Sequence, residues 1–300
     1  MADQATKLRE FIKKDAKISA QECKANIITI TSGKGGVGKS NVAVNLALDL
    51  ISKGKRVLII DADLGLANVE ILMGVIPKFT LNDVIDGNKT FKEIICEGEG
   101  GLKFISGGSG IENLANLSED KLVRFSKELS DLDDEFDVII IDTGAGISQT
   151  VMTFARIAHQ ILLVTTSDPT AITDAYALLK VLSGNEENAP DVKVVVNMVK
   201  NKADAEGVFN KLNLVCEKFL NRSLEVIEFI PDDSALEKAV RKQKPVYLEY
   251  PRSEVSNAFK KLGTKIEKLL KEDDEIEVVK VPSKKGILAL FSGLGKKNNE

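Results

Sequence analysis

This 300-residue chain is poor in the residues on which several kinds of site chemistry depend. It has no tryptophan, one histidine (His159) and three cysteines, Cys23, Cys96 and Cys216, which lie far apart and form no C-x-x-C pair. A single histidine excludes triad-type catalysis and histidine-based metal sites. Separated cysteines argue against structural zinc, an iron–sulfur scaffold or a disulfide framework, and they suit a reducing cytoplasm.

The chain also lacks a strong excess of charge and long apolar runs. It has 45 acidic and 41 basic side chains and a formal net charge of −4, whereas broad nucleic-acid binding usually needs a basic excess. We see no signal-peptide pattern, and no apolar run approaches the ~20 residues that span a bilayer. Hydrophobic residues make up 43% of the chain, enough for a sizeable core in one large domain or two. We expect no nucleic-acid partner and a cytoplasmic location.

The most informative stretch is Asn26–Ser40, NIITITSGKGGVGKS. A run of β-branched residues, typical of a buried strand, leads into four glycines and then into a helical pattern. This is G-x-x-x-x-G-K-S in the context of a phosphate-binding loop, where backbone N–H groups and a helix N-terminus surround phosphate. Lys39 is expected at the β- and γ-phosphates and Ser40 on Mg²⁺. The predicted nucleotide-binding residues of the loop are Gly33, Lys34, Gly35, Gly36, Val37, Gly38, Lys39, Ser40 and Asn41.

Carboxylates follow two further predicted strands. Asp61 ends the apolar run Lys55–Asp61, and Asp63 comes two residues later, so both are expected beside the phosphates and close to Mg²⁺. Asp142 ends a second apolar run, which gives it the position of a Walker B aspartate that holds Mg²⁺ through water. The N–H of Gly144 is expected to approach the γ-phosphate and to sense its loss.

The lysine at position 34 is not needed in an ordinary P-loop. GKGGVGKS resembles the deviant Walker A motif of the MinD/ParA ATPases, and DADLGLAN resembles their D-x-D-x-G-x-x-N switch. The resemblance implies that Lys34 crosses the interface of an ATP-bound dimer to the partner's phosphates. It also implies that Asp61 belongs to the Mg²⁺ shell and that Asp63 orients the attacking water. The implied catalytic residues are Lys34, Lys39 and Asp63, and the metal residues are Ser40, Asp61 and Asp142.

The same family resemblance continues along the chain. Thr166–Pro169 resembles the family's T-x-[EDN]-P loop, in which Asp168 either contacts the partner nucleotide or caps the following helix. Asn197 is placed to read adenine, since a carboxamide offers both a donor and an acceptor. Pro231 and Asp232 match the I-P-x-D loop that flanks the base. The chain lacks the N/T-K-x-D motif of GTPases, which favours ATP over GTP.

The N-terminal arm carries a short motif of its own. DQATKLRE resembles the D-Q-A-x-x-L-R activation motif of the FlhG flagellar-number regulators, themselves MinD-type ATPases. In that family the motif binds and stimulates the signal-recognition-type GTPase FlhF. The alternative is a solvated arm without a partner. Asp3, Gln4, Ala5, Leu8 and Arg9 match the motif, and the predicted partner-binding residues are Asp3, Gln4, Leu8 and Arg9.

The C-terminal tail SKKGILALFSGLGKK gathers its apolar residues on one side of a predicted helix, with lysines at both ends. This pattern is typical of a helix that lies in the interface of an anionic membrane. The alternatives are a helix that docks back on its own domain and a frayed tail that binds nothing. The predicted membrane-facing residues are Ile287, Leu288, Leu290, Phe291 and Leu294.

Strands alternate with helical stretches from Asn26 to Leu270, which predicts one doubly wound, mostly parallel α/β domain of the three-layer, Rossmann-like kind. A helix is predicted over Ser118–Asp131 and a last one over Ser253–Leu270. We expect an arm over 1–25, a MinD-type ATPase domain over 26–271, a linker over 272–283 and an amphipathic helix over 284–297.

The predicted function is a slow, dimerisation-activated ATP hydrolase that uses ATP and Mg²⁺. It would act as a monomer–dimer and membrane-binding switch that regulates flagellar number and placement, and flagellar basal-body or transcription-factor proteins are further candidate partners. Two alternatives stay open: a ParA-type DNA-partition ATPase, and a metabolic or metal-cluster relative with the same P-loop.

Overall fold

The computed structural model describes residues 25–63, 68–108, 131–132, 134–184 and 191–277, with the side chains of 272–277 left aside. In this part of the chain eight strands form one sheet in the order β3-β4-β2-β5-β1-β6-β7-β8. All neighbouring strands run parallel except β3 and β4 at one edge. The strands are β1 (Asn26–Ser32), β2 (Val57–Ala62), β3 (Cys96–Glu97), β4 (Lys103–Ile105), β5 (Val138–Ala145), β6 (Gln160–Thr165), β7 (Val192–Val199) and β8 (Glu225–Pro231).

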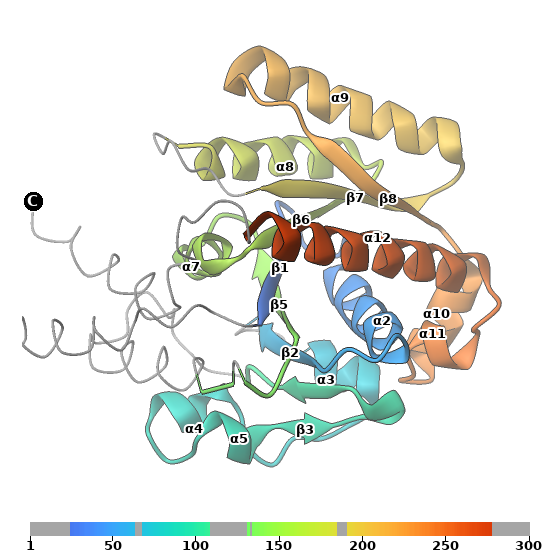
Figure 1. Cartoon of the computed structure of the whole chain (residues 1–300). Helices are drawn as coiled ribbons and strands as arrows, with labels where there is room; N and C mark the ends of the chain where they lie inside the picture. The colour runs from blue at the N-terminus through green and yellow to red at the C-terminus, as the bar shows by residue number, and fades with distance from the viewer. Residues whose placement is uncertain (1–24, 64–67, 109–130, 133, 185–190, 278–300) are drawn as a thin grey trace, which may run out of the picture.

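Helices cover both faces of this sheet (Figure 1). One face packs against α2, α3, α10, α11 and α12, and the other against α4, α5, α7, α8 and α9. The helices are α2 (Lys39–Ser52), α3 (Asn68–Met73), α4 (Leu81–Ile85), α5 (Phe91–Ile94), the 3₁₀ turn η1 (Glu99–Gly101), α7 (Gln149–Ile157), α8 (Pro169–Leu182), α9 (Lys202–Leu220), α10 (Ser234–Arg241), α11 (Val246–Glu249) and α12 (Glu254–Glu277).

The central strand β1 is buried on both faces, although only Ile27, Ile28 and Ile30 among its residues are apolar. Every residue of β1 is buried, because side chains on both faces of a central parallel strand meet a helix layer. Ile28 and Ile30 belong to the core under α2, whereas Ile27 belongs to the core on the opposite face. The buried hydroxyl of Thr29 donates to the Phe154 carbonyl of α7, 3.0 Å away.

The register of the sheet brings polar residues together at the carboxyl ends of its strands. β5 lies between β1 and β2, with Asp142 opposite Ile30 on one side and opposite Asp61 on the other. The loop after β1 therefore lies next to two carboxylates from different strands. This edge is where ligands bind in open α/β sheets.

The predicted fold class is confirmed: the sheet is mostly parallel, covered by helices on both faces and built from the expected strands. The last helix differs from its predicted bounds, and a second predicted helix lies almost wholly outside the described residues. The last helix does not end at Leu270 but continues to Glu277, through the first residues of the predicted linker, because Lys and Glu favour helix and no Gly or Pro interrupts it there. The helix predicted over 118–131 falls, apart from its last residue, outside the described residues.

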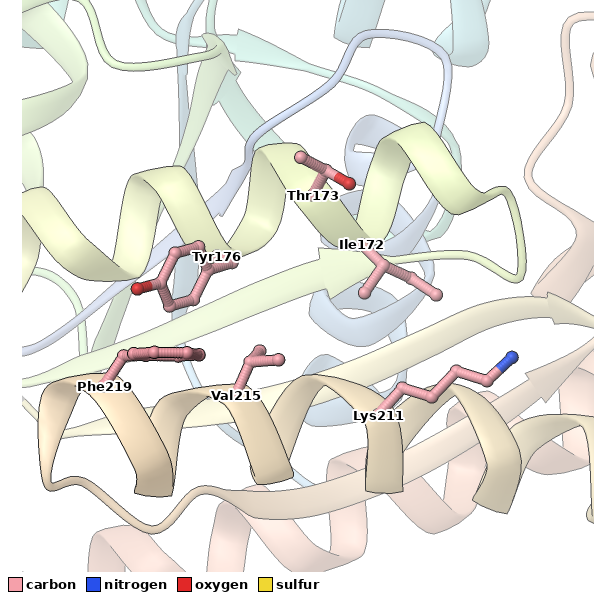
Figure 2. A pocket seen from close by; sticks show the side chains of 6 residues that line it. All are labelled: Ile172, Thr173, Tyr176, Lys211, Val215 and Phe219. Carbon is pink, nitrogen blue, oxygen red and sulfur yellow. The ribbon is translucent and has the colours of Figure 1, made fainter.

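Away from the strand ends, α8 and α9 border a groove of about 450 Å³ (Figure 2). The groove is lined by Ile172, Thr173 and Tyr176 of α8 and by Lys211, Val215 and Phe219 of α9, and in Figure 2 Ile172 and Tyr176 point toward α9. Within the described ranges no helix is long and apolar enough to cross a membrane.

Candidate nucleotide site

The glycine loop forms a tight connection between β1 and α2, and two of its glycines are fixed by close neighbours. A Cβ on Gly33 would lie 2.1 Å from the backbone carbon of Asp174 in α8. Gly38, the N-cap of α2, has φ 89°, and a Cβ there would lie 2.4 Å from Nδ2 of Asn197. Larger residues at these two positions would push the loop away from α8 and β7. The sequence therefore needs glycine here for both conformation and space.

Lys39 is the first residue of α2, and its ammonium points back into the loop. The residue is only 8% exposed, and its Nζ donates to Oγ of Ser32, 3.0 Å away. Burial lowers the pKa of Lys39, while the nearby charges of Asp142 and Asp63 oppose that shift. A buried cation at a helix N-terminus, among backbone N–H groups, is suited to bind a phosphate.

The three predicted carboxylates meet at the adjoining strand ends, but their surroundings differ. Asp142 is fully buried, and neither of its oxygens accepts a hydrogen bond of standard geometry among the described residues, although the Ser40 hydroxyl lies close enough to lower its pKa. The two oxygens of Asp61 accept the backbone N–H groups of Asp63 and Val69, each over 3.1 Å. Asp61 therefore also binds the backbone of Asp63 and of the first turn of α3, whereas both oxygens of Asp142 remain available for a ligand.

Burial raises the pKa of both Asp61 and Asp142, and the charge of Asp142 raises that of Asp61 further. Two buried carboxylates side by side, with oxygens left over, are suited to a divalent cation. Mg²⁺ takes one or two carboxylates together with waters and substrate phosphates, so these groups fit a MgATP site without a complete protein cage. Ser40, half-buried one residue after Lys39, is placed for the same ion.

Asp63 and Gly144 lie next to each other beside this pair. A Cβ on Gly144 would lie 3.5 Å from Oδ1 of Asp63, and Oδ2 of Asp63 accepts from Nδ2 of Asn68 over 3.3 Å. The two residues predicted to orient water and to sense the γ-phosphate are thus neighbours in space. Asp63 directly follows β2, and Gly144 belongs to β5.

The predicted adenine residues gather on the other side of the loop, at the ends of β7 and β8. Nδ2 of Asn197 donates to the Val37 carbonyl over 2.8 Å, while its buried Oδ1 has no partner among the described residues. The N–H of Asp232 donates to the Val199 carbonyl over 3.0 Å, and Pro231 pairs with Val199. Asn197, Pro231 and Asp232 therefore lie together, with one buried acceptor left for a base.

Lys34 lies apart from Lys39 although both belong to one loop. Its Nζ donates to Oδ2 of Asp168 over 2.6 Å and to Oγ1 of Thr170 over 2.5 Å. Oδ1 of Asp168 accepts from the Thr170 N–H over 2.8 Å, so Asp168 is the N-cap of α8. The capping alternative for Asp168 is confirmed, and the ion pair with Lys34 was not predicted.

Three residues of this region carry no motif and were missed from the sequence. Ser32 links Lys39 to the carbonyl of Lys34, to which its hydroxyl donates over 2.7 Å. Thr170 binds Lys34, and Met198 has φ 56°, rare for a side chain of its size. A hollow of about 530 Å³ is lined by Lys34, Gly35, Gly36, Val37, Thr166, Ser167, Asp168 and Met198. In the sequence, the only sign that one of these three residues lies at the site is that Met198 directly follows Asn197.

The predicted arm residues and the predicted membrane-facing residues lie outside the described part of the chain. The loop, its helix and the buried carboxylates, at the centre of a parallel sheet, define the class of this protein. It is a P-loop NTPase.

Similarity to known proteins shows to which family of P-loop NTPases the chain belongs. Residues 24–267 match the ParA family described as NUBPL iron-transfer P-loop NTPase. The chain is 42% identical to the antiactivator FleN of Pseudomonas aeruginosa over 241 residues, 80% of this chain and 86% of FleN. It is 35% identical to the flagellum site-determining protein YlxH of Helicobacter pylori over 299 residues, 98% of each chain. The cell division ATPase MinD of Pyrococcus furiosus superposes with a TM-score of 0.67 at 26% identity, covering 82% of this chain and 99% of MinD. The chain belongs to the MinD/ParA family of P-loop ATPases.

Proposed function

We propose that this protein is an ATP-dependent dimerisation switch that regulates the number and placement of flagella. The observation that carries the proposal is the contrast between the two lysines of the loop. Lys39 is buried and faces the carboxylates, whereas the Lys34 side chain is 37% exposed and leaves the loop toward α8. A cation on the outer side of a phosphate loop is available to a second molecule, where it acts like an arginine finger supplied in trans.

The nucleotide is MgATP. Lys39 and the loop N–H groups bind the phosphates, while Ser40 and Asp142 would hold Mg²⁺, which supplies charge neutralisation at the β- and γ-phosphate oxygens. The Asp142 oxygens, which remain available for a ligand, support this assignment. Because Nδ2 of Asn197 is engaged by Val37, its free Oδ1 is the atom that faces the base. An acceptor there favours the 6-amino group of adenine over the 6-oxo group of guanine.

Hydrolysis ends the dimeric state. Asp63 orients the attacking water, and the N–H of Gly144 loses a contact when the γ-phosphate leaves. Both groups lie at the same edge of the sheet, which supports the proposal that hydrolysis and the loss of the γ-phosphate contact occur together. Turnover is slow because the useful output is the change of state, and the chain then returns to the monomer.

The flagellar role follows from the relatives, among which are an antiactivator FleN and a flagellum site-determining protein YlxH. In this proposal the arm residues Asp3, Gln4, Leu8 and Arg9 stimulate the GTPase FlhF. The tail over 284–297 holds the ATP-bound dimer at the inner face of the cytoplasmic membrane, and the monomer is cytoplasmic. One tail binds weakly, and two tails in one dimer bind much better through effective concentration.

Liposome co-sedimentation tests the switch with the full chain and with a chain truncated after Val281, in ATP, ADP or no nucleotide. We expect vesicles rich in anionic lipid to pellet the full chain in ATP alone, and the truncated chain to stay in solution. Pelleting without nucleotide, or equal pelleting of the truncated chain, would contradict the proposal. FlhF GTPase assays with the full chain and with an Arg9→Ala variant then test the flagellar assignment.

A further inference from the structure

The ammonium of Lys34 is held by two groups from the start of α8. Asp168 Oδ2 and Thr170 Oγ1 accept from it over 2.6 and 2.5 Å. Thr170 Oγ1 in turn donates to Asp168 Oδ1 over 2.8 Å, which closes a triangle of three side chains. Two of the three N–H donors of Lys34 are therefore engaged within its own chain.

The carboxylate in this triangle is also held by the backbone of α8. The N–H of Thr170 binds Oδ1 of Asp168 as part of the α8 cap, and this leaves Oδ2 facing the loop. The Lys34 hydrogen bond, followed by those of Thr170, lowers the pKa of Asp168 well below its ordinary value. Asp168 is thus negatively charged at any pH at which the protein works.

The backbone keeps the beginning of α8 at the loop. Gly33 lies so close to Asp174 that no side chain fits between them, and this contact fixes the distance between the loop and α8. Lys34 follows Gly33, and Asp168 and Thr170 lie at the start of the same helix. The pair therefore reflects a fixed juxtaposition, and it forms one wall of the 530 Å³ hollow beside the loop.

We propose that Asp168 and Thr170 form a latch that holds Lys34 within its own chain and must open before Lys34 can reach the nucleotide of a second copy. This inference rests on the proposed function. In this proposal Asp168 and Thr170 are positioning residues, because they act through their contacts with Lys34. The triphosphate of a second copy carries more negative charge than one carboxylate, so it competes with Asp168 for the ammonium and releases the latch. The latch thereby raises the protein concentration at which ATP-bound chains pair.

Sedimentation velocity of the full chain with Mg²⁺ and a non-hydrolysable ATP analogue tests the latch through the dimer dissociation constant. Asp168→Asn keeps the α8 cap, because asparagine caps helices as well as aspartate does, and removes the charge. The Lys34–Asp168 pair is exposed, and exposed pairs have small coupling energies, so we expect Asp168→Asn to lower the dissociation constant about two- to fivefold. Thr170→Val should act in the same direction with a smaller effect.

Glu93→Gln is the matched control. Glu93 accepts from Lys89 over 2.9 Å in an ion pair of similar exposure, and its second oxygen accepts from the Thr90 N–H at the start of α5, away from the loop. This control should leave the dissociation constant unchanged. In a Lys34→Ala background, Asp168→Asn should have no further effect, which a merely structural role of Asp168 would not predict.

The outcomes separate the latch from the proposed function. If the unsubstituted chain stays monomeric with the analogue, the proposed function fails and the latch fails with it. If it dimerises and Asp168→Asn leaves the dissociation constant unchanged at an unchanged melting temperature, the latch alone is overturned. A weaker dimer with Asp168→Asn would also overturn it, because Asp168 would then act across the interface.

Discussion

At the scale of single residues, Asp142 combines complete burial with two oxygens that accept no hydrogen bond of standard geometry among the described residues. Asp61 lies opposite it on β2, and burial raises the pKa of both carboxyls. A carboxyl whose folded-state pKa exceeds its unfolded value binds more protons when folded. Stability therefore falls as the pH rises from about 4, the ordinary carboxyl pKa, toward the raised value. Asp142 therefore lowers the stability of the ligand-free protein, although the proposed MgATP ligand requires this carboxylate.

Asp142→Asn should make the ligand-free protein more stable at pH 8 by roughly 1–3 kcal/mol, because it removes a buried charge. The gain should shrink at pH 5, where the wild-type carboxyls are protonated. Urea unfolding at both pH values measures it, and Glu97→Gln, an exposed carboxylate, serves as the control. The same variant should lose the rise in melting temperature that MgATP gives the wild type. An equal gain at both pH values would refute this account.

At the scale of helices, a buried polar cluster attaches the P-loop helix to the C-terminal helices. Asp49 of α2 is 2% exposed, and it accepts from Lys53 over 2.5 Å and from the Tyr247 hydroxyl over 3.1 Å. Lys53 also donates to Thr264 of α12 over 2.9 Å. Gly263 allows α12 to approach, since a Cβ there would lie 1.9 Å from Oδ2 of Asp49. The P-loop helix and α12 are therefore joined by polar contacts and by a close approach of their backbones.

Two glycine-to-alanine variants within helices should have opposite effects. Gly207 lies in α9, where a Cβ meets nothing within 4 Å, so Gly207→Ala should stabilise the protein by about 0.5–1 kcal/mol through helix propensity. Gly263→Ala should destabilise it by about 1–3 kcal/mol, because the methyl group overlaps Asp49. Chemical denaturation of the two variants measures both changes. Stabilisation by Gly263→Ala would show that the α2–α12 approach is looser than described.

At the scale of the whole molecule, the two lysines of the loop have separate tasks in the proposed switch: one binds the nucleotide of its own chain, and the other serves dimer formation. Lys39 serves its own nucleotide, whereas Lys34 lies 134 positions from the aspartate that holds it and faces outward. Loss of either lysine should abolish the switch, but at different steps. The switch thus depends on one buried and one accessible cation in the same loop.

Lys34→Ala should bind ATP with nearly wild-type affinity, remain monomeric and lose at least about tenfold in ATPase rate, as expected when a trans cation is removed. Lys39→Ala should fail to bind the nucleotide at all. Fluorescent-nucleotide titration and light scattering after gel filtration distinguish the two variants. Dimers of Lys34→Ala formed as readily as those of the wild type would exclude a trans role for this lysine.

The sequence by itself determined the elements that depend on neighbouring residues in the chain. β1, the glycine loop and the start of α2 are contiguous, and apolar runs that end in Asp61 and Asp142 predict buried strands with carboxylates at one edge. These features were predicted because burial and backbone geometry act over a few residues.

Only the tertiary structure decided which distant residues meet. Asn197 donates to Val37 across 160 positions, and Lys34 pairs with Asp168 across 134. The order of strands in the sheet brings the ends of β6 and β7 to the loop, and no local pattern encodes that order. The ion pair of Lys34 was missed for this reason, since the loop around Asp168 indicated only a helix cap or a contact with the partner nucleotide, and Thr170 carries no motif.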